Sequence, residues 1–213
     1  MSVETIRKLS EKYTKSTKAD YWRGSAFEDV VKLTNDERGK WGEEVLFDWV
    51  NTHTNIPIEW DGDNNTDPDD GTYDLWTKSV EWTEYPSYVF NKNRIEKKTS
   101  GRTLSKGRPT GWQHENVYID DKWDTLSFLD YDANNIIYLT IVRYDQLVVD
   151  GKFTLKIFGK EAHQRKNEEG KYKVDFSMKS IKNGIDAGVT FTYDLNNPDD
   201  EGLAKFLNDK LGE

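Results

Sequence analysis

Apolar residues recur at helical spacing through the first third of the chain. Between residues 3 and 13 an apolar side chain stands every three or four positions, which is the spacing of one face of an α-helix. Ser25 with Glu28, and Thr34 with Glu37, have the spacing of a capping box, in which each side chain bonds a backbone N–H of the other residue. Each pair therefore predicts the start of a helix.

The helix predicted for residues 35 to 51 is the most informative one. Three apolar residues stand three, four and seven positions after Glu43: Leu46, Phe47 and Val50. Glu43 therefore shares their apolar stripe, whereas Glu44 and Asp48 fall on the opposite, polar side. We expect the Glu43 carboxylate to point inward.

After residue 57 the pattern changes to short runs that are typical of strands. These runs cover residues 58 to 60, 73 to 77, 80 to 83 and 94 to 99. A nearly continuous apolar run from residue 135 to residue 144 predicts a strand that is covered on both faces, at the centre of the sheet. The stretch from 109 to 117 fits either a short helix or a loop.

The last third predicts further strands and a closing helix. Residues 153 to 158 and 173 to 178 have strand patterns, and Asn183-Gly184 is a hairpin turn signal before a strand at 189 to 193. Asn197 precedes Pro198 as a helix N-cap would. The apolar stripe of this helix consists of Leu203, Phe206, Leu207 and Leu211. The fold class expected is α/β, with a mixed central β-sheet flanked by helices.

The length and composition favour one domain in an intracellular protein. A chain of 213 residues is long enough for one core, so we expect a single domain, with a helical part at 1–33, a core at 34–144 and C-terminal strands and a helix at 145–213. The absence of cysteine excludes disulfides, thiolate metal sites and a cysteine nucleophile. No stretch has the length or apolarity of a membrane helix or a leader, which favours a cytoplasmic protein without a membrane partner.

The charge is unevenly distributed along the chain. The formal net charge is -9, which by itself argues against a passive nucleic-acid binder. Between residues 92 and 108, however, only Glu96 is acidic, and the basic residues are Lys92, Arg94, Lys97, Lys98, Arg102, Lys106 and Arg108. This basic strip on an acidic body predicts a surface that faces a polyanion.

Two predicted strands carry the candidate chemistry. Asp74 lies in the first, and strand alternation puts Arg94, Glu96 and Lys98 on one face of the second, with Ile95 on the other. If the two strands are neighbours, two carboxylates and a lysine converge. Carboxylate oxygens suit Mg²⁺, which can activate a water for attack on a phosphodiester.

Asp74 followed by Glu96-x-Lys98 resembles the PD-(D/E)xK nuclease superfamily, to which most type II restriction endonucleases belong. The resemblance implies a restriction endonuclease-like core, Mg²⁺ held by Asp74 and Glu96, a catalytic Lys98, and a further carboxylate from the preceding helix, here Glu43. Tyr73 stands where the family has proline, and the nearer acid Glu81 lacks the lysine. We expect a deoxyribonuclease that cuts double-stranded DNA at a specific site, acting as a homodimer because a two-fold site favours a symmetric pair.

Residues 100 to 116 follow the proposed catalytic strand and are rich in glycine and basic side chains. The residues expected to contact DNA are Arg94, Arg102, Lys106, Arg108, Trp112, Gln113 and His114. Trp112 has core packing as an equal alternative, and for His114 a hydrogen-bonding or DNA-contacting role is favoured over that of a general base. For Glu96 and Lys98 the alternative is an exposed cross-strand salt bridge.

A second hypothesis comes from the aromatic content. Eight Trp and eleven Tyr residues could form the contact surface of a non-enzymatic module that binds carbohydrate or protein. Such a module needs neither Mg²⁺ nor Lys98, so metal dependence distinguishes it from a nuclease.

Overall fold

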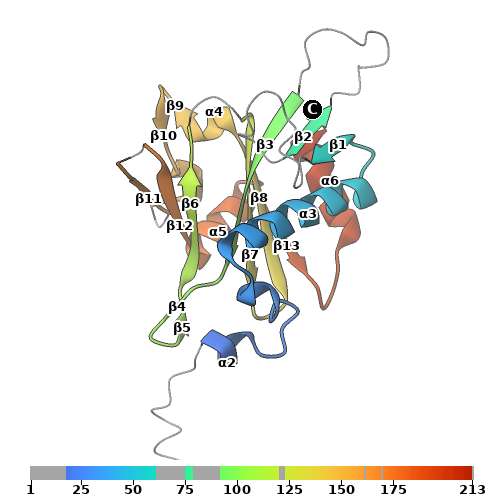
Figure 1. Cartoon of the computed structure of the whole chain (residues 1–213). Coiled ribbons are helices and arrows are strands. Elements are labelled where there is room, and N and C mark those ends of the chain that lie inside the picture. Colours follow the sequence, from blue (N-terminus) through green and yellow to red (C-terminus); the bar gives the residue numbers. More distant parts are fainter. Residues whose placement is uncertain are drawn as a thin grey trace, which may run out of the picture.

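A six-stranded mixed sheet lies in the middle of the molecule (Figure 1). The computed structural model describes residues 18–60, 75–78, 92–119, 123–160, 162–168 and 170–212. The sheet has the order β1-β2-β3-β7-β8-β13, and its strands are β1 (Ile58–Trp60), β2 (Leu75–Lys78), β3 (Lys92–Gly101), β7 (Thr125–Asp132), β8 (Ile136–Arg143) and β13 (Thr190–Asp194). Neighbouring strands are antiparallel except β3 and β7, which are parallel.

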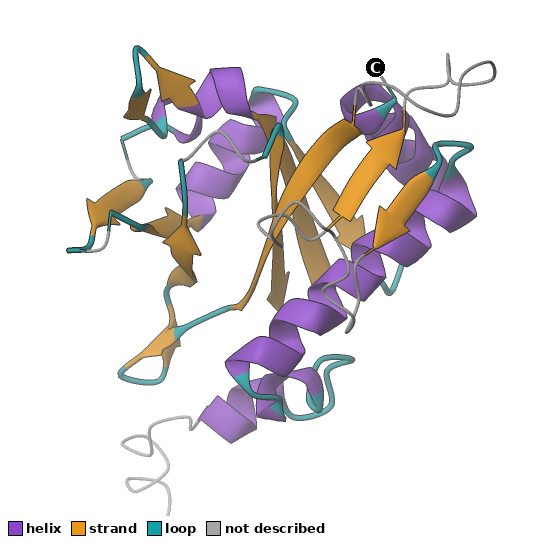
Figure 2. Ribbon diagram, turned by 45° about the horizontal axis from the view of Figure 1, so that its top comes forward, coloured by secondary structure: helices purple, strands orange, loops and turns teal. Residues whose placement is uncertain are grey.

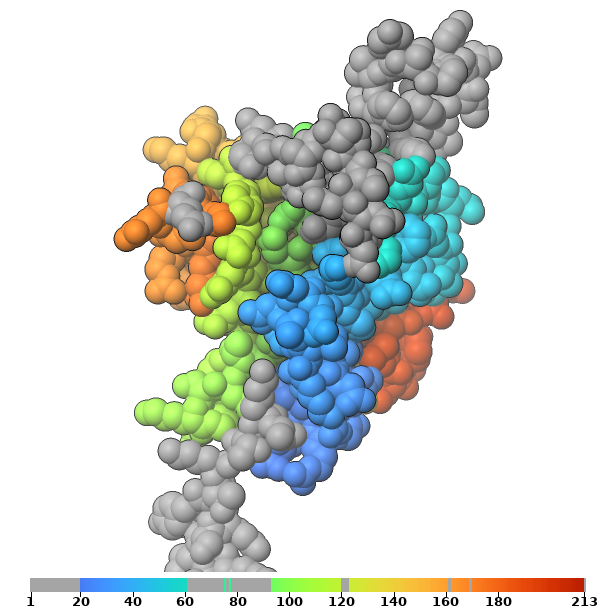
Figure 3. Space-filling view, in the orientation of Figure 1, coloured from blue at the N-terminus to red at the C-terminus, as the bar shows by residue number. Residues whose placement is uncertain are grey.

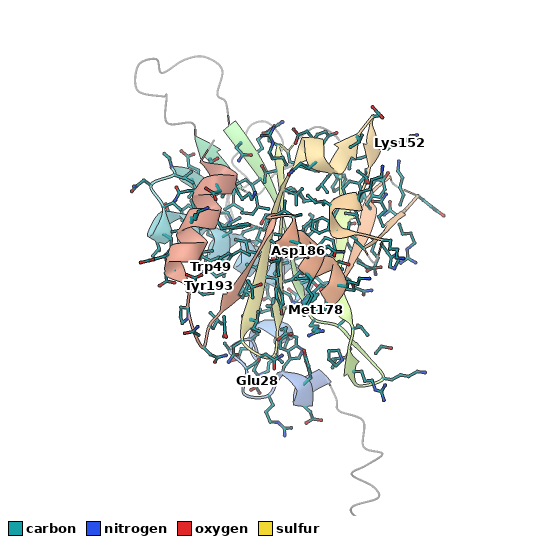
Figure 4. The ribbon with its side chains drawn as sticks, turned by 180° about the vertical axis from the view of Figure 1, so that it is seen from behind. Glu28, Trp49, Lys152, Met178, Asp186 and Tyr193 are labelled. Atoms are coloured by element: carbon teal, nitrogen blue, oxygen red, sulfur yellow. The ribbon has the colours of Figure 1, made fainter. Side chains whose placement is uncertain are left out.

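Helices cover one face of this sheet. They are α2 (Lys18–Trp22), α3 (Asn35–His53) and α6 (Asp200–Leu211), with the short helix η1 (Val30–Lys32) between the first two. Their apolar side chains form one core cluster with residues of the sheet. Figure 4 shows Trp49 of α3 beside Tyr193 of β13, with ring centroids 5.1 Å apart.

A small second sheet and one helix cover the other face. The sheet has the order β11-β12-β6, and these elements are β6 (Gly111–Val117), β11 (His163–Lys166), β12 (Tyr172–Ser177) and α5 (Met178–Asp186). The shorter elements are β4 (Leu104–Ser105), β5 (Arg108–Pro109), α4 (Tyr144–Leu147), β9 (Val148–Val149), β10 (Lys152–Phe153) and η2 (Lys156–Phe158). Strand β7 separates the two cores, since Leu129 and Tyr131 belong to the first cluster and Leu126 and Phe128 to the second.

The α/β class and the mixed sheet with flanking helices are confirmed. Helix α3 begins at the capping box that Thr34 forms with Glu37, and β1 has the predicted bounds. The strand predicted at 135 to 144 is β8, which is paired on both sides. No helix among the described residues is long and apolar enough to cross a membrane.

Some local predictions are wrong. Residues 111 to 117 form strand β6 rather than a helix or loop, and Asn183-Gly184 lies inside α5 rather than in a hairpin turn. Ser25 and Glu28 close a turn, in which Gly24 N donates to Glu28 Oε2 over 2.7 Å, and start no helix. The N-cap of α6 is Asp199. Strand β7 was not predicted at all.

Helix α3 approaches β3 closely at a glycine. A Cβ atom added to Gly42 would lie 1.9 Å from Thr99 Oγ1 and 2.9 Å from Thr99 Cβ. Any larger residue would force the helix away from the strand. Gly42 therefore fixes how close α3 lies to the strand that carries the candidate site.

Replacing Gly42 by alanine should lower the free energy of unfolding by about 1–3 kcal/mol, because the methyl group overlaps Thr99. Gly39, in the same helix, is the matched control, since its added Cβ would meet nothing nearer than Glu43 Oε1 at 3.9 Å. Gly39→Ala should instead stabilise the helix by up to about 1 kcal/mol. Urea denaturation of both variants measures the difference, and equal effects would contradict the close approach.

Candidate active site

Strand β3 continues past the described part of its neighbour β2. The described pairing with β2 runs from Lys78↔Lys92 to Leu75↔Ile95. On its other side β3 pairs with β7 from Ile95 to Gly101. The second half of β3 is thus held by β7 and lies beyond the described part of β2.

A cleft of about 910 Å³ follows this half of β3. Its walls are the first half of α3 and strand β6, and residues 97 to 104 form the part between them. Figure 3 shows this face, with α3 in blue and with β3 and β6 in green. Five basic residues line the cleft against three acidic ones, the basic ones being Arg38, Lys40, Lys97, Lys98 and Arg102. The cleft therefore suits an anionic ligand.

Glu96 and Lys98 lie on one face of β3, as strand alternation predicts. Lys98 Nζ forms an ion pair with Glu96 Oε1, and only 20% and 7% of the two side chains are exposed. Ile95 points into the core on the opposite face. The pair joins two residues of one strand and is largely buried, so it is not the exposed cross-strand bridge of the alternative.

Glu43 of α3 lines the same cleft as Lys98. It is half-buried, whereas Glu44 and Asp48 are exposed, as the helix pattern predicts. Trp60 Nε1 of β1 donates a hydrogen bond of 2.9 Å to Glu43 Oε2. This bond fixes the carboxylate on the α3 wall of the cleft.

Asp74 and Glu81 lie outside the described residues, as do Tyr73 and the strand predicted at 80 to 83. Asp74 is the residue before Leu75 in the sequence, and Leu75 lies opposite Ile95, the residue before Glu96. The described part of the predicted Asp74 strand, β2, is thus a neighbour of β3, the strand that carries Glu96, as expected. Among the described residues, no three acidic or histidine side chains form a group that could hold a metal ion.

Arg94 and Arg102 each pair with a carboxylate of β7 or of the turn before it. Arg94 Nε and Nη2 donate to the two oxygens of Asp124 over 2.9 and 3.0 Å. Arg102 Nη1 donates to Asp132 Oδ2 over 2.7 Å, and its guanidinium lies 5.0 Å from the centre of the Trp112 ring. Both arginines thus connect β3 to neighbouring elements in addition to any contact with DNA.

Trp112 and His114 are core residues of β6. Trp112 is wholly buried, and its Nε1 donates to Tyr131 O over 3.0 Å. His114 is 2% exposed, and its Nε2 lies 2.9 Å from Asp130 Oδ1. Trp112 packs in the second core cluster, as its alternative interpretation predicts, whereas the buried His114 also lines the cleft.

Lys106, Arg108 and Gln113 are exposed. The first two lie on a hairpin formed by β4 and β5, which projects from the body of the molecule (Figure 2). Lys106 and Gly107 form its two-residue turn and have φ angles of 51° and 75°, as a tight hairpin turn requires. Gln113 lines the cleft. Of the residues predicted to bind DNA, these three are exposed, and Arg94 and Arg102 are partly buried.

Sequence reasoning missed the residues that form the inner wall of the cleft. Trp22 of α2, Arg38 of α3 and Tyr131 of β7 line it. Arg38 stands five positions before Glu43, about 140° around the helix axis, so helix periodicity does not place the two on one face. Trp22 lies in a part that was predicted to be helical without helix bounds, and strand β7, which carries Tyr131, was not predicted.

The chain matches no protein-family model, no curated protein and no solved structure. The PD-(D/E)xK resemblance therefore stays a prediction, and function has to be argued from the geometry of the cleft.

The ion pair at the start of β3 gives a pH-dependent prediction. Burial raises the pKa of Asp124, but the hydrogen bonds and charge of Arg94 outweigh it and hold the pKa below its ordinary value of 3.8. The pair therefore stabilises the fold above that pH, and this stabilisation is lost as the pH falls through the lowered pKa. Because 43% of the Asp124 side chain is exposed, solvent screening limits the effect.

We expect Asp124→Asn to lower the free energy of unfolding at pH 7 by up to about 1 kcal/mol, with a difference from wild type that shrinks below pH 4. Asp145→Asn is the control, because Asp145 and its partner Arg143 are each 64% exposed. This variant should change stability by less than about 0.5 kcal/mol at either pH. Denaturation curves at several pH values test the pair, and a constant Asp124→Asn difference would argue against it.

Proposed function

We propose that this protein is a Mg²⁺-dependent endonuclease that hydrolyses phosphodiester bonds of double-stranded DNA. The observation that carries the proposal is the Glu96–Lys98 pair, which is largely buried beside a basic cleft. Removing such a pair from water costs on the order of several kcal/mol per ion. The attraction between the two charges offsets this cost only when their geometry is good. A carboxylate and an ammonium kept together at this cost are best explained by chemistry in the cleft.

The carboxylates fit a hard divalent ion. Glu96 is 6% exposed, and Glu43 is held on the facing wall by Trp60. We assign Glu96 and Asp74 as the residues that hold Mg²⁺, with Glu43 binding it directly or through water. When bound, the ion neutralises charge on the phosphate and activates a water.

Lys98 has the second chemical role. Its side chain is 20% exposed, and the residue lines the cleft, so it can touch a phosphate that enters. Paired with Glu96, it is held where it orients the attacking water and donates to a phosphate oxygen. The remaining basic residues of the cleft attract the anionic strand.

The β4–β5 hairpin is the part that we assign to docking on the duplex. It carries Lys106 and Arg108 at an exposed turn, and the first strand connects directly to the cleft through Arg102 and Thr103. Gln113, exposed on β6, is the remaining candidate for reading a base edge. A restriction-type enzyme of the cytoplasm that works as a homodimer is the finer form of this proposal, because two such sites cut both strands of a two-fold sequence.

The binding-module hypothesis finds less support among the described residues. Trp22, Trp112 and Trp123 are buried at 1% exposure or less, and Trp49 is 8% exposed. Tyr118, at 38%, is the one exposed aromatic residue in that part of the chain. Most of the described aromatic side chains therefore pack in or against the two cores.

Lys98→Ala and Glu96→Gln should each lower the rate of plasmid cleavage at least about a hundredfold, because each removes a group that acts on the reacting phosphate. Cleavage by wild-type protein should require Mg²⁺ and stop with chelator. Gel analysis of supercoiled plasmid and phage DNA measures both effects.

Lys182→Ala is the matched control, since Lys182 is exposed on α5 away from the cleft. This variant should cut as wild type does. If the wild-type protein leaves duplex, single-stranded and branched DNA intact with Mg²⁺ present, or if Lys98→Ala cuts normally, the proposal fails.

Lys106→Ala and Arg108→Ala should weaken duplex binding and lower the salt dependence, because each removes one phosphate contact. The slope of log K against log salt should fall by about one for each variant. Fluorescence anisotropy in Ca²⁺, over a range of salt concentrations, measures it. An unchanged slope would remove the hairpin from the interface.

A further inference from the structure

Several buried polar atoms lack a hydrogen-bond partner in the described part of the molecule. Those in residues that line the cleft include four donors, Trp22 Nε1, Arg38 Nε, Thr99 Oγ1 and Tyr131 Oη, besides Arg102 Nε and His114 Nδ1. Buried polar atoms are almost always paired, since an unpaired one costs about 1–3 kcal/mol. Four such atoms in residues that all line one cleft call for a common explanation.

The four side chains come from four elements that line the cleft. The Tyr131 ring of β7 lies 5.5 Å from that of Trp22 of α2. It packs against Gly101 of β3, where an added Cβ would stand 2.9 Å from Tyr131 Oη. The Tyr131 ring therefore fills the space that a side chain at Gly101 would occupy.

Arg38 and Thr99 close the same region from α3 and β3. Arg38 Nη2 donates to Leu33 O over 2.9 Å, which holds the guanidinium in place and leaves Nε without a partner. Burial raises the pKa of Tyr131 to about 12, and the positive charge of Arg38 opposes that rise, so the two groups lie within electrostatic reach. Thr99 stands two positions before Gly101 on the same face of β3.

The chemistry of this group selects an acceptor. Indole Nε1 and guanidinium Nε can only donate, and both hydroxyls are free to donate. One water molecule accepts two hydrogen bonds and cannot satisfy four donors, whereas an oxyanion accepts from all of them. Asp36, Glu43 and Glu115 also line the cleft, but the basic residues outnumber them.

We propose that Trp22, Arg38, Thr99 and Tyr131 form a binding site for a phosphate group, separate from Glu96 and Lys98. The site does not rest on the proposed nuclease function, because it needs neither Mg²⁺ nor the Glu96–Lys98 pair. If the protein acts on DNA, the site holds a backbone phosphate next to the one that is cut.

Inorganic phosphate is the probe, and calorimetric titration in the presence of chelator keeps the measurement independent of cleavage. Wild-type protein should bind phosphate, and chloride at equal ionic strength should not reproduce the heat. Tyr131→Phe removes one hydroxyl and should weaken binding about tenfold, as expected for a hydrogen bond to a charged group. Thr99→Val keeps the shape of the side chain and should weaken phosphate binding to the same extent. It is the test variant if Tyr131→Phe folds poorly.

Tyr193→Phe is the matched control, because the Tyr193 hydroxyl bonds Asp200 over 2.6 Å outside the cleft. This variant should bind phosphate as wild type does. The site is overturned if wild type binds no phosphate, if Tyr131→Phe and Thr99→Val both bind as tightly as Tyr193→Phe, or if a crystal grown in phosphate shows ordered water only among the four donors.

A short DNA duplex added as competitor identifies the source of the phosphate. Displacement of inorganic phosphate by the duplex, weakened in Tyr131→Phe, supports a site for the nucleic-acid backbone. Phosphate binding without displacement supports a site for a small phosphate compound. Either result supports the phosphate site even if the protein cuts no DNA. Failure of the phosphate site and failure of the nuclease proposal can therefore be told apart.

Discussion

The parallel ladder between β3 and β7 is the constraint on which the rest of the structure depends. Each residue from Ile95 to Gly101 is paired with one from Thr125 to Tyr131. Parallel neighbours need a crossover, and here the chain between them makes the β4–β5 hairpin and then β6. This excursion places β6 opposite α3, so the two walls of the cleft follow from one strand pairing.

The same ladder carries buried polar groups along most of its length. Glu96, Lys97 and Ser100 of β3, with Asp130 and Asp132 of β7, are all less than 9% exposed. Partners come from elsewhere in the chain: His114 faces Asp130, and Arg102 faces Asp132. Apolar side chains at these positions would be buried at less cost, so these polar groups depend on the partners that the fold brings to them.

The parts that the sequence predicts well depend on local patterns. The inward Glu43 and the common face of Glu96 and Lys98 follow from helix and strand periodicity alone. Strand β7 could not be recognised, because its acids at 130 and 132 suggest a polar segment until distant partners are known. By sequence, Gly184 belongs to a hairpin turn signal, yet it lies in helix α5. An added Cβ there would lie 2.3 Å from Thr190 Oγ1. Tertiary packing therefore decides the conformation at this glycine.

Two ion pairs on β3 show why burial alone does not assign a role. Arg94 and Asp124 form three hydrogen bonds, two from the guanidinium and one from the backbone, and connect the start of β3 to the segment before β7. That geometry explains the pair as structural, although its side chains are 32% and 43% exposed.

The Glu96–Lys98 pair is the opposite case. It is more buried, and it joins two residues of a single strand. Removing it from water therefore costs more than removing the partly exposed Arg94–Asp124 pair. Its place beside the cleft, opposite a carboxylate held by Trp60, is the observation on which the proposed function rests.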